Sequence, residues 1–421
     1  MPGAGIRYNR AMDIEIRAIG PDRIRDFTRV TQTAFGETMP EEAIAFYTRA
    51  TEWDRAIAAY DGDRVVGTGG ADSMQLTLPG LTAIPVGGLT AIAVLPTHRR
   101  RGILRAIINR HFEDVEERAE PVSVLNASES VIYGRFGYGL ATLQADLEIE
   151  TRHGAFLRPS APPGRLRLLE PGELLEVLPA FYDRARRAQP GELSREEHRW
   201  GLYAEDPEWN REGASRHHDV VYESEPGRVD GWLGYRLESR WTDAGLPNNL
   251  ASVRHLYALS PEAGAALWRY CLDLDLVSTV RLHDRPLDDP LRWYLADPRR
   301  LRTIAVGDQL WVRLLDLPAA LAARRYATAD ALVLEVGDPL RPRNQGRFRL
   351  EGGPDGATCR PTRAEPDVAL GVTELGAAYL GGIRLASLGR AGRVHELTPG
   401  ALVRADAMLA SEPGPWSTTH F

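Results

Sequence analysis

Apolar and polar residues follow one another along this chain in a recurring order of short strand, turn and helix. The clearest example begins with an apolar strand at Leu89–Leu95, followed by a basic turn that ends in glycine. Apolar residues then recur at helical spacing, at Ile103, Leu104, Ile107, Ile108, Phe112 and Val115. A second apolar strand, Val122–Leu125, comes after this helix. The pattern predicts a mixed α/β (α+β) fold in which a turn joins a strand directly to a helix.

The same order recurs further along the chain, which predicts a duplication. Residues 152–164 are rich in Pro, Gly and Ala and are typical of a linker. Beyond them a strand, a helix, several strands, a helix starting at Pro261 and a final strand repeat the first pattern, whereas the last part has short strands followed by helices. We therefore expect three domains, at residues 1–152, 165–300 and 301–421.

The turn after the first strand has the chemistry of an anion site. The first N–H groups of a helix lack intrahelical partners and lie at the positive end of its dipole, so the main chain alone can hold a phosphate there. Gly102 permits close approach because it has no Cβ, and Arg99, Arg100 and Arg101 surround the same turn with cationic donors. In the second copy Glu262 stands in place of these arginines, so we expect no phosphate site there.

Composition narrows the class of protein without identifying it. A chain of 421 residues exceeds what one hydrophobic core normally serves. No apolar stretch is long enough to cross a membrane and residues 1–13 contain no signal-like apolar core, so we expect a cytoplasmic protein without membrane attachment. The net charge of −7 argues against nucleic acid as a partner and is compatible with cationic ones. Cys271 and Cys359 lack metal-ligand spacing, so we expect two core thiols and no metal site.

An aromatic-glycine run after the second strand completes a pattern that we can compare with known families. The segments PTHRRRG (96–102) and ASESVIYGRFGYG (127–139) resemble the acetyl-CoA core of the GCN5-related N-acetyltransferases (GNAT), and specifically the Eis (enhanced intracellular survival) subfamily. The total length and the bare C-terminal Phe421 resemble the Eis layout. The resemblance implies tandem GCN5-related acetyltransferase domains, the second without a cofactor turn, followed by a sterol-carrier-protein-like domain.

The resemblance also implies a cofactor site for acetyl-CoA. The phosphates are expected at the turn and the first helical residues, and the pantetheine arm along the main chain of the preceding strand, where one N–H group can stabilise the oxyanion. Two loop residues are expected to touch the cofactor, although loop capping explains them nearly as well. The expected cofactor residues are Ile92, Ala93, Val94, Arg100, Arg101, Gly102, Ile103, Leu104, Arg105, Ser128 and Glu129.

Acetyl transfer to an amine needs a proton donor for the departing thiolate and a proton acceptor for the amine. The family motif selects Tyr133 rather than Tyr138 as the general acid, and a tyrosine with a pKa near about 10 stays protonated at neutral pH. The resemblance further implies that the tail, residues 412–421, returns to the first domain and presents the α-carboxylate of Phe421 as the proton acceptor, through water if not directly. From its polar composition we expect this tail to contribute little to the core.

The acceptor remains open between two classes. The leading hypothesis is an N-acetyltransferase acting on amines of aminoglycosides or similar polyamines. A protein-lysine acetyltransferase using the same site is the first alternative, and a lipid-carrier or interaction protein with a vestigial core is the second. His420 stands where a relative carries an acid, which leaves substrate preference undecided. Because relatives form rings of six, we expect a homohexamer.

Overall fold

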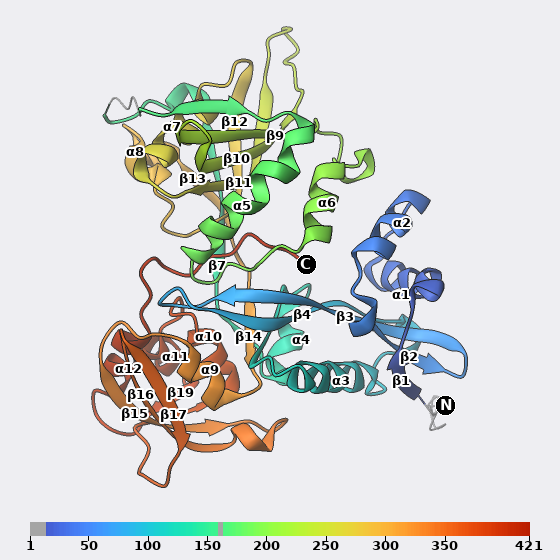
Figure 1. The fold of residues 1–421 in the computed structure, drawn as a ribbon, viewed down its shortest axis with the longest axis vertical. Coiled ribbons are helices and arrows are strands. Elements are labelled where there is room, and N and C mark those ends of the chain that lie inside the picture. Colours follow the sequence, from blue (N-terminus) through green and yellow to red (C-terminus); the bar gives the residue numbers. More distant parts are fainter. Residues whose placement is uncertain (1–13, 159–162) are drawn as a thin grey trace, which may run out of the picture. The chain divides into compact units, whose positions relative to one another are not determined.

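A computed structural model describes residues 14–158 and 163–421 of the chain (Figure 1). The predicted absence of a signal core at residues 1–13 lies outside the described residues, as does part of the expected linker. By its internal contacts the chain divides into two units, one containing residues up to Asp72 together with Leu89–Glu117, and the other Ser73–Gly88 with Arg118–Phe421. Two long strands, β3 (Arg64–Thr77) and β4 (Ala83–Val94), continue from one unit into the other.

The first unit contains the opening strands and helices. Strand β2 pairs antiparallel with β1 and with the first part of β3. The apolar faces of α1 and α3 close over these strands, with Phe27, Val30, Ile103 and Ile107 in one core. The remaining elements of this unit are β1 (Ile14–Ala18), α1 (Ile24–Phe35), α2 (Glu41–Ala50), β2 (Ile57–Asp61) and α3 (Ile103–Glu117).

The second unit begins with the rest of the first sheet. Here β4 pairs parallel with β5 over Val86–Gly88, and β14 inserts antiparallel between β5 and β6. Helix α4 follows β5 and contains the first residues of the aromatic-glycine run, which continues beyond the helix to Tyr138. The bounds are β5 (Val122–Leu125), α4 (Ser130–Tyr133), β6 (Gly139–Leu140) and β14 (Trp311–Leu314).

A second sheet of seven strands has the order β13-β7-β12-β11-β10-β9-β8. Helices α5 and α7 cover opposite faces of it: α7 packs with Val220 and Leu233, and α5 with the alternating neighbours Val221 and Trp232. Its elements are β7 (Leu143–Glu150), β8 (Arg165–Leu168), α5 (Leu174–Arg187), α6 (Glu197–Glu205), β9 (His218–Glu225), β10 (Arg228–Glu238), β11 (Asn249–Ala258), α7 (Pro261–Leu272), β12 (Val277–Arg285), α8 (Leu291–Tyr294) and β13 (Arg302–Asp308).

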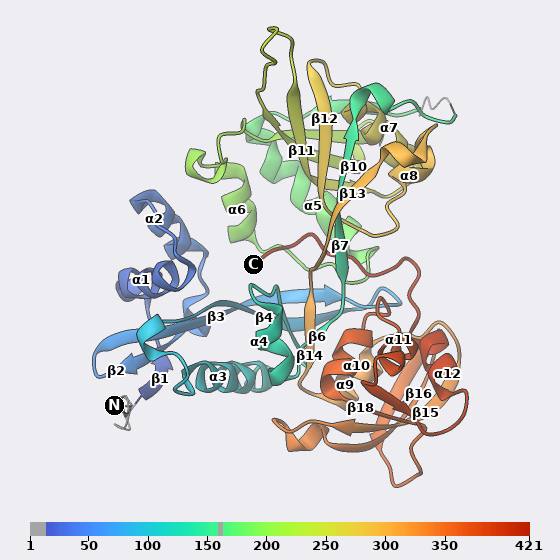
Figure 2. The same ribbon diagram turned by 180° about the vertical axis from the view of Figure 1, so that it is seen from behind.

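Two strands lie in a sheet other than the one their position in the sequence suggests. β7, from the end of the expected first domain, pairs with β12 and β13 in the second sheet, and Figure 2 shows these strands from behind. β14, from the expected third domain, pairs with β5 and β6. Sheet membership therefore does not follow the expected divisions near residues 152 and 300 strand by strand, and those boundaries stay a prediction.

The third sheet has five strands in the order β17-β16-β15-β18-β19. Its helices pack a dense apolar interior that includes Leu321, Leu334, Tyr379 and Met408. The elements are α9 (Leu317–Ala323), β15 (Asp330–Gly337), β16 (Gly346–Gly353), β17 (Gly356–Pro361), β18 (Val368–Gly371), α10 (Val372–Ala378), α11 (Leu385–Arg390), β19 (Val394–Glu396) and α12 (Ala401–Leu409). Among the described residues, none of the helices is long and apolar enough to span a bilayer.

Candidate active site

The basic turn lies between β4 and α3, as the sequence predicts. A short 3-10 turn at Pro96–His98 leads to an exposed loop, and α3 begins at Ile103. Arg100 and Gly102 both adopt left-handed backbone conformations, with φ of 62° and 83°. That conformation is costly for most residues and free for glycine, so the loop is held in a specific shape where it enters the helix.

This helix start is suited to an anion. Ala106 N–H donates to Gly102 O at 3.0 Å, which leaves the N–H groups of the preceding turn directed out of the helix. The first turn of α3 contains no acidic residue, and a Cβ built on Gly102 would meet no atom within 4 Å. Arg99, Arg100 and Arg101 are all exposed beside it. A phosphate group can therefore approach main-chain and guanidinium donors together.

A buried histidine anchors this turn within the first unit. His98 Nδ1 lies 2.8 Å from Thr97 Oγ1, and its Nε2 lies 3.4 Å from Asp61 Oδ2 at the end of β2. The side chain is buried, although three arginines follow it in the sequence. The link fixes the start of the basic loop to the β2–β3 hairpin. Sequence reasoning missed it, because a lone histidine in a basic run carries no spacing signal.

The last part of β4 departs from regular strand geometry just before the expected pantetheine-binding residues. Ala91 has a φ of 52°, and its carbonyl accepts a hydrogen bond from Thr68 Oγ1 at 2.9 Å. A left-handed residue inside a strand changes the direction of the residues that follow. β5 ends at Leu125, one position past the Gly88–Val124 pair, whereas β4 continues to Val94.

The two tyrosines of the aromatic-glycine run have different environments. Tyr138 is completely buried, and its hydroxyl lies 2.8 Å from Ser123 Oγ, which in turn donates to Gly87 O at 3.0 Å. Tyr133 ends α4, is 5% exposed, and contacts Tyr138 edge to face at 6.1 Å between ring centroids. Tyr138 is thus committed to joining β4 and β5, whereas Tyr133 lies next to the loop that carries Ser128 and Glu129.

Burial is the main cause of the shifted pKa of Tyr133, and the two loop residues modify it. Burial raises the pKa of the Tyr133 hydroxyl, a hydrogen bond with Ser128 opposes the rise, and the charge of Glu129 adds to it. Ser128 and Glu129 are exposed. The net result is a phenol that stays protonated across the neutral range. The structure therefore brings Tyr133, Ser128 and Glu129 together, and whether all three meet a cofactor stays a prediction.

The chain ends against the first sheet. A Cβ built on Gly88 of β4 would lie 2.8 Å from Phe421 Cε2 and 2.1 Å from Met74 Cε, so only glycine leaves room for the terminal ring. The Arg199 guanidinium carbon lies 6.0 Å from the Phe421 ring centroid, and Arg199 Nη1 donates to His420 O at 3.1 Å. Phe421 thus lies on the same strand whose later residues are Ile92–Val94.

His420 points to an acidic partner. Its Nε2 lies 3.2 Å from Asp284 Oδ2. Burial pushes the pKa of Asp284 up, but the hydrogen bond and charge of His420 and the neighbouring cations hold it below its ordinary value. Because the Asp284 carboxylate is ionised at neutral pH, a negative charge remains near the chain's end although His420 itself is not an acid.

The tail differs from its sequence-based prediction. It has no helix, as expected, but Trp416, Ser417, Thr418 and Thr419 are all buried. Trp416 belongs to the core on the α5 face of the second sheet. The expectation that the tail contributes little to the core was therefore wrong, because hydroxyl side chains can be buried when each finds a hydrogen-bond partner. The partner is Glu192, a residue that sequence reasoning did not single out.

The second copy of the turn is built as a plain helix start. Ser260 caps α7 by accepting a hydrogen bond from Ala263 N–H at 3.2 Å, and Glu262 lies in the first turn. The cap and the acid take up the donors and the positive end of the dipole. This agrees with the expectation that the second copy binds no phosphate, which itself stays a prediction.

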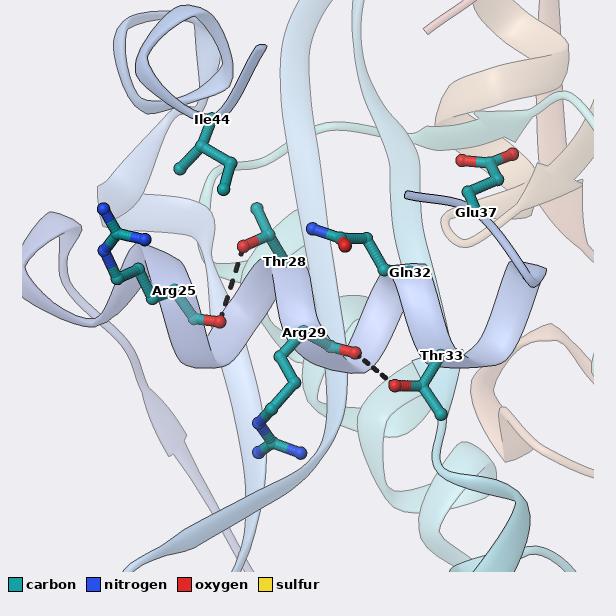
Figure 3. A pocket seen from close by; sticks show the side chains of 7 residues that line it. All are labelled: Arg25, Thr28, Arg29, Gln32, Thr33, Glu37 and Ile44. Carbon is teal, nitrogen blue, oxygen red and sulfur yellow. Dashed lines mark hydrogen bonds between the residues drawn. The ribbon is translucent and has the colours of Figure 1, made fainter. Parts of the chain in front are cut away.

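A polar cavity of about 320 Å³ lies between the two opening helices (Figure 3). Thr28 and Thr33 on α1 donate hydrogen bonds to carbonyls of their own helix, so their hydroxyl protons are not offered to a ligand. Phe46 is buried, Tyr47 is 40% exposed, and neither lines this cavity. Its lining residues are Arg25, Thr28, Arg29, Gln32, Thr33, Glu37 and Ile44.

Cys271 and Cys359 are both buried and form no disulfide, as expected for core thiols. Burial raises the pKa of each thiol to about 12, so neither is a thiolate near neutral pH. Within residues 14–158 and 163–421, no cluster of three or more acidic, histidine or cysteine side chains could hold a metal ion.

Comparison with known domain families identifies the class of protein to which this chain belongs. Residues 15–141 and 191–314 each match an acetyltransferase (GNAT) domain family, and residues 317–418 match the sterol carrier protein domain family. The protein is thus an acyltransferase with two GNAT domains followed by a sterol-carrier-like domain, as the sequence predicts.

Relatives over nearly the full length define the family. An uncharacterized N-acetyltransferase of Streptomyces avermitilis is 44% identical over 87% of this chain and 89% of its own. N-acetyltransferase Eis of Mycobacterium tuberculosis is 37% identical over 89% of this chain and 90% of its own. The crystal structure of Eis1 from Mycobacterium abscessus superimposes with a TM-score of 0.84 at 35% identity, covering 97% of this chain and 100% of that one. The chain belongs to the Eis family of N-acetyltransferases.

Proposed function

We propose that this enzyme transfers an acetyl group from acetyl-CoA to amines of aminoglycosides or similar polyamines by direct attack. The observation that carries the proposal is the position of the chain's end: the Phe421 ring lies on Gly88 of β4, four residues before the segment expected to hold the thioester arm. A terminal carboxylate at this strand combines a negative charge with proton-accepting capacity, and a cationic amine needs both.

Acetyl-CoA is the cosubstrate that suits the basic turn. Its pyrophosphate needs several donors around a helix start without an opposing acid, and the α3 start offers that arrangement with Arg100, Arg101 and Gly102. Ile103, Leu104 and Arg105 contribute the first main-chain N–H groups. Ile92–Val94 offer main-chain groups to the pantetheine arm, and a preorganised N–H there contributes a few kcal/mol to stabilising the oxyanion.

Tyr133 is the proposed general acid. Its raised pKa keeps the hydroxyl protonated, so it can donate a proton to the departing sulfur, whose basicity is comparable to that of a phenolate. Tyr138 is unsuited to the role, since its fully buried hydroxyl is engaged with Ser123. Ser128 orients the Tyr133 hydroxyl through their hydrogen bond.

The α-carboxylate of Phe421 is the proposed proton acceptor. A solvated α-carboxyl has a pKa of about 3.3 to 3.7, so it takes a proton from an ammonium poorly by itself. We propose that it acts through an ordered water and also holds the cationic acceptor electrostatically. Asp284, whose Oδ2 lies 3.2 Å from Nε2 of His420, adds a second negative charge next to the last residue.

The interior of the sterol-carrier-like domain supports an enzyme over a lipid carrier. Arg324 is fully buried there and donates to Leu409 O at 2.9 Å and to Tyr379 O. A buried guanidinium next to a packed aromatic and aliphatic core leaves an environment poorly suited to an acyl chain.

A thiol-release assay with acetyl-CoA and a panel of amines tests the proposal. The panel contains an aminoglycoside, spermine, a lysine-containing peptide, and an aminosugar with a single amine as a control for charge. We expect kcat/KM to be highest for the aminoglycoside or spermine and at least ~10-fold lower for the aminosugar with a single amine, because one charge-assisted contact contributes roughly 1.5 to 3 kcal/mol. A preference for the peptide would replace the acceptor class, and absence of thiol release with every amine would refute the activity.

A further inference from the structure

The residue that organises the tail is Glu192, a carboxylate with no exposed surface. Its own backbone is fixed to the end of β3, because Gly191 N–H donates to Thr77 O at 2.8 Å and Thr77 N–H donates to Glu192 O at 3.0 Å. The bridge between Leu76 and Leu193 extends this antiparallel contact. Glu192 is therefore held by the first sheet before it contacts the tail.

Both carboxylate oxygens of Glu192 receive hydrogen bonds from the tail. Oε1 accepts from Ser417 Oγ at 3.1 Å and from Thr419 Oγ1 at 3.0 Å. Oε2 accepts from Thr418 N–H at 3.0 Å. Three successive residues of an irregular segment thus end on a single side chain. A buried carboxylate needs such donors, and the tail in turn needs buried acceptors for its hydroxyl groups.

Three more side chains complete the enclosure. Tyr257 on β11 donates to Glu192 Oε2 at 2.9 Å and also contacts Thr418 Oγ1. The Tyr182 hydroxyl lies 3.0 Å from Thr419 Oγ1. Arg195 lies over the Tyr182 ring at 4.3 Å and donates to Thr418 Oγ1 at 3.3 Å. We call Tyr182, Glu192, Arg195 and Tyr257 the tail socket.

Trp416 fixes the tail where it enters the socket. Strands β11 and β12 pair in parallel as far as Val253 and Leu282. Beyond that point Trp416 contacts both: its Nε1 donates to Asp284 O at 2.6 Å, and its ring lies 5.5 Å from the Tyr257 ring. The tail therefore occupies the opening between the two central parallel strands of the second acetyltransferase-like domain.

The socket lies immediately before the chain's end. Thr419 is the last tail residue that the socket holds by hydrogen bonds. Phe421 is two residues further on, a span of at most ~7 Å. At the far side of that span the Phe421 ring lies on Gly88. Because the segment is fixed on both sides, the terminal carboxylate has a small range of positions.

We propose that the tail socket is a positioning device for the reaction: through Glu192 and Thr419, the second acetyltransferase-like domain sets the place of the Phe421 carboxylate. The inference rests on the proposed function of that carboxylate. It gives the second domain a role in acetyl transfer that needs no cofactor. The socket residues act through the tail and do not touch the reacting atoms.

The test compares Thr419→Val, which removes the hydroxyl and keeps the side-chain shape, with Thr419→Ser, which restores it. Two readouts are measured on the full-length enzyme: release of Phe421 by carboxypeptidase A, and steady-state kinetics with acetyl-CoA and spermine. For Thr419→Val we expect Phe421 release to rise roughly 10-fold and kcat to fall roughly 10-fold, because the end group loses its fixed position. The KM for acetyl-CoA should stay unchanged. Thr419→Ser should bring both the rate of Phe421 release and kcat most of the way back to their wild-type values.

Ser411→Ala is the matched control, since the Ser411 hydroxyl lies just before the tail and outside the socket, where it donates to Pro413 O. It should leave both readouts at the wild-type value. Glu192→Gln is the second variant, with the melting temperature recorded to detect misfolding.

Unchanged Phe421 release in Thr419→Val would overturn the socket, whatever the kinetics. Faster release with an unchanged kcat would overturn the positioning role. Failure of the proposed function itself is distinguishable, because a wild-type enzyme without thiol release still gives a readable carboxypeptidase result.

Discussion

Replacing each tyrosine of the aromatic-glycine run by phenylalanine should separate catalysis from stability. Tyr133→Phe removes a hydroxyl that is hydrogen-bonded to Ser128 in an exposed loop, so the fold loses little. Loss of a general acid lowers kcat by about 10², equivalent to about 2.7 kcal/mol in the activation free energy. The KM for acetyl-CoA should change less than ~2-fold, since the hydroxyl is needed at the departing sulfur and not for binding.

Tyr138→Phe should give the opposite result. Its hydroxyl belongs to a fully buried chain of hydrogen bonds from Tyr138 through Ser123 to Gly87 O. Removing one such bond costs about 0.5 to 1.5 kcal/mol, which corresponds to a melting temperature lower by roughly 1 to 6 °C for a domain of 150 to 250 residues. kcat should stay within ~3-fold of wild type.

Thiol release under acetyl-CoA saturation, together with thermal unfolding, measures both effects. Equal kcat losses in the two variants would refute the assignment of the acid, because two tyrosines in such different environments cannot both be the donor. A kcat loss confined to Tyr138→Phe would show that the wrong tyrosine was chosen.

Three other predictions concern the turn, the pH dependence and the assembly. Arg100→Glu should raise the KM for acetyl-CoA at least ~10-fold, whereas Arg64→Glu, the same charge change at the exposed start of β3, should not; an unchanged KM would mean that the turn is misassigned. Burial and the charge of Arg55 lower the pKa of His111 to about 3, so the folded state keeps this histidine neutral. The unfolded chain takes up a proton below about pH 6.5, and stability is therefore lost as the pH falls. Hydrogen exchange in α3 should show an opening free energy that is lower by about 1.4 kcal/mol at pH 5.5 than at pH 7.5, and His111→Gln should not show this loss. Light scattering should give the mass of a hexamer, and a clean monomer would remove that expectation.

The strand, basic turn and helix of the first domain could be predicted because each depends on local signals. The apolar spacing of α3 and the glycine before it determine where the helix starts, and the structure begins it at Ile103. The sterol-carrier-like part and the irregular tail were also foreseen in outline, through resemblance and through the Pro/Gly content of the tail.

The lengths of β3 and β4 could not be predicted, because glycines interrupt their strand pattern. We expected separate strands at Arg64–Thr68 and Met74–Leu78 and a strand from Leu89, whereas β3 runs without a break from Arg64 to Thr77 and β4 begins at Ala83. The reason for one of these glycines is tertiary: a Cβ on Gly69 would lie 2.6 Å from Ile107 Cγ2 on α3. A glycine inside a strand pattern can mark a close approach, but it does not show which element approaches or whether the strand continues past it.

The tail socket was equally invisible in the sequence. Glu192 and Thr419 are separated by 227 positions, and neither belongs to a periodic segment. Polar partners at such a distance have no spacing rule, and a run of Ser and Thr is usually a solvated loop. Only the fold shows that these hydroxyls are buried.

The most direct test of the account is to move the end of the chain. Adding two glycines after Phe421 shifts the carboxylate by up to ~7 Å and puts a neutral amide in its place. Because residues 416–419 keep their partners and His420 is exposed, the melting temperature should not change. We predict that kcat for amine acetylation falls by at least ~10²-fold while the KM for acetyl-CoA is retained. An extended enzyme with wild-type kcat and an unaltered melting temperature would contradict a catalytic role for the C-terminal carboxylate.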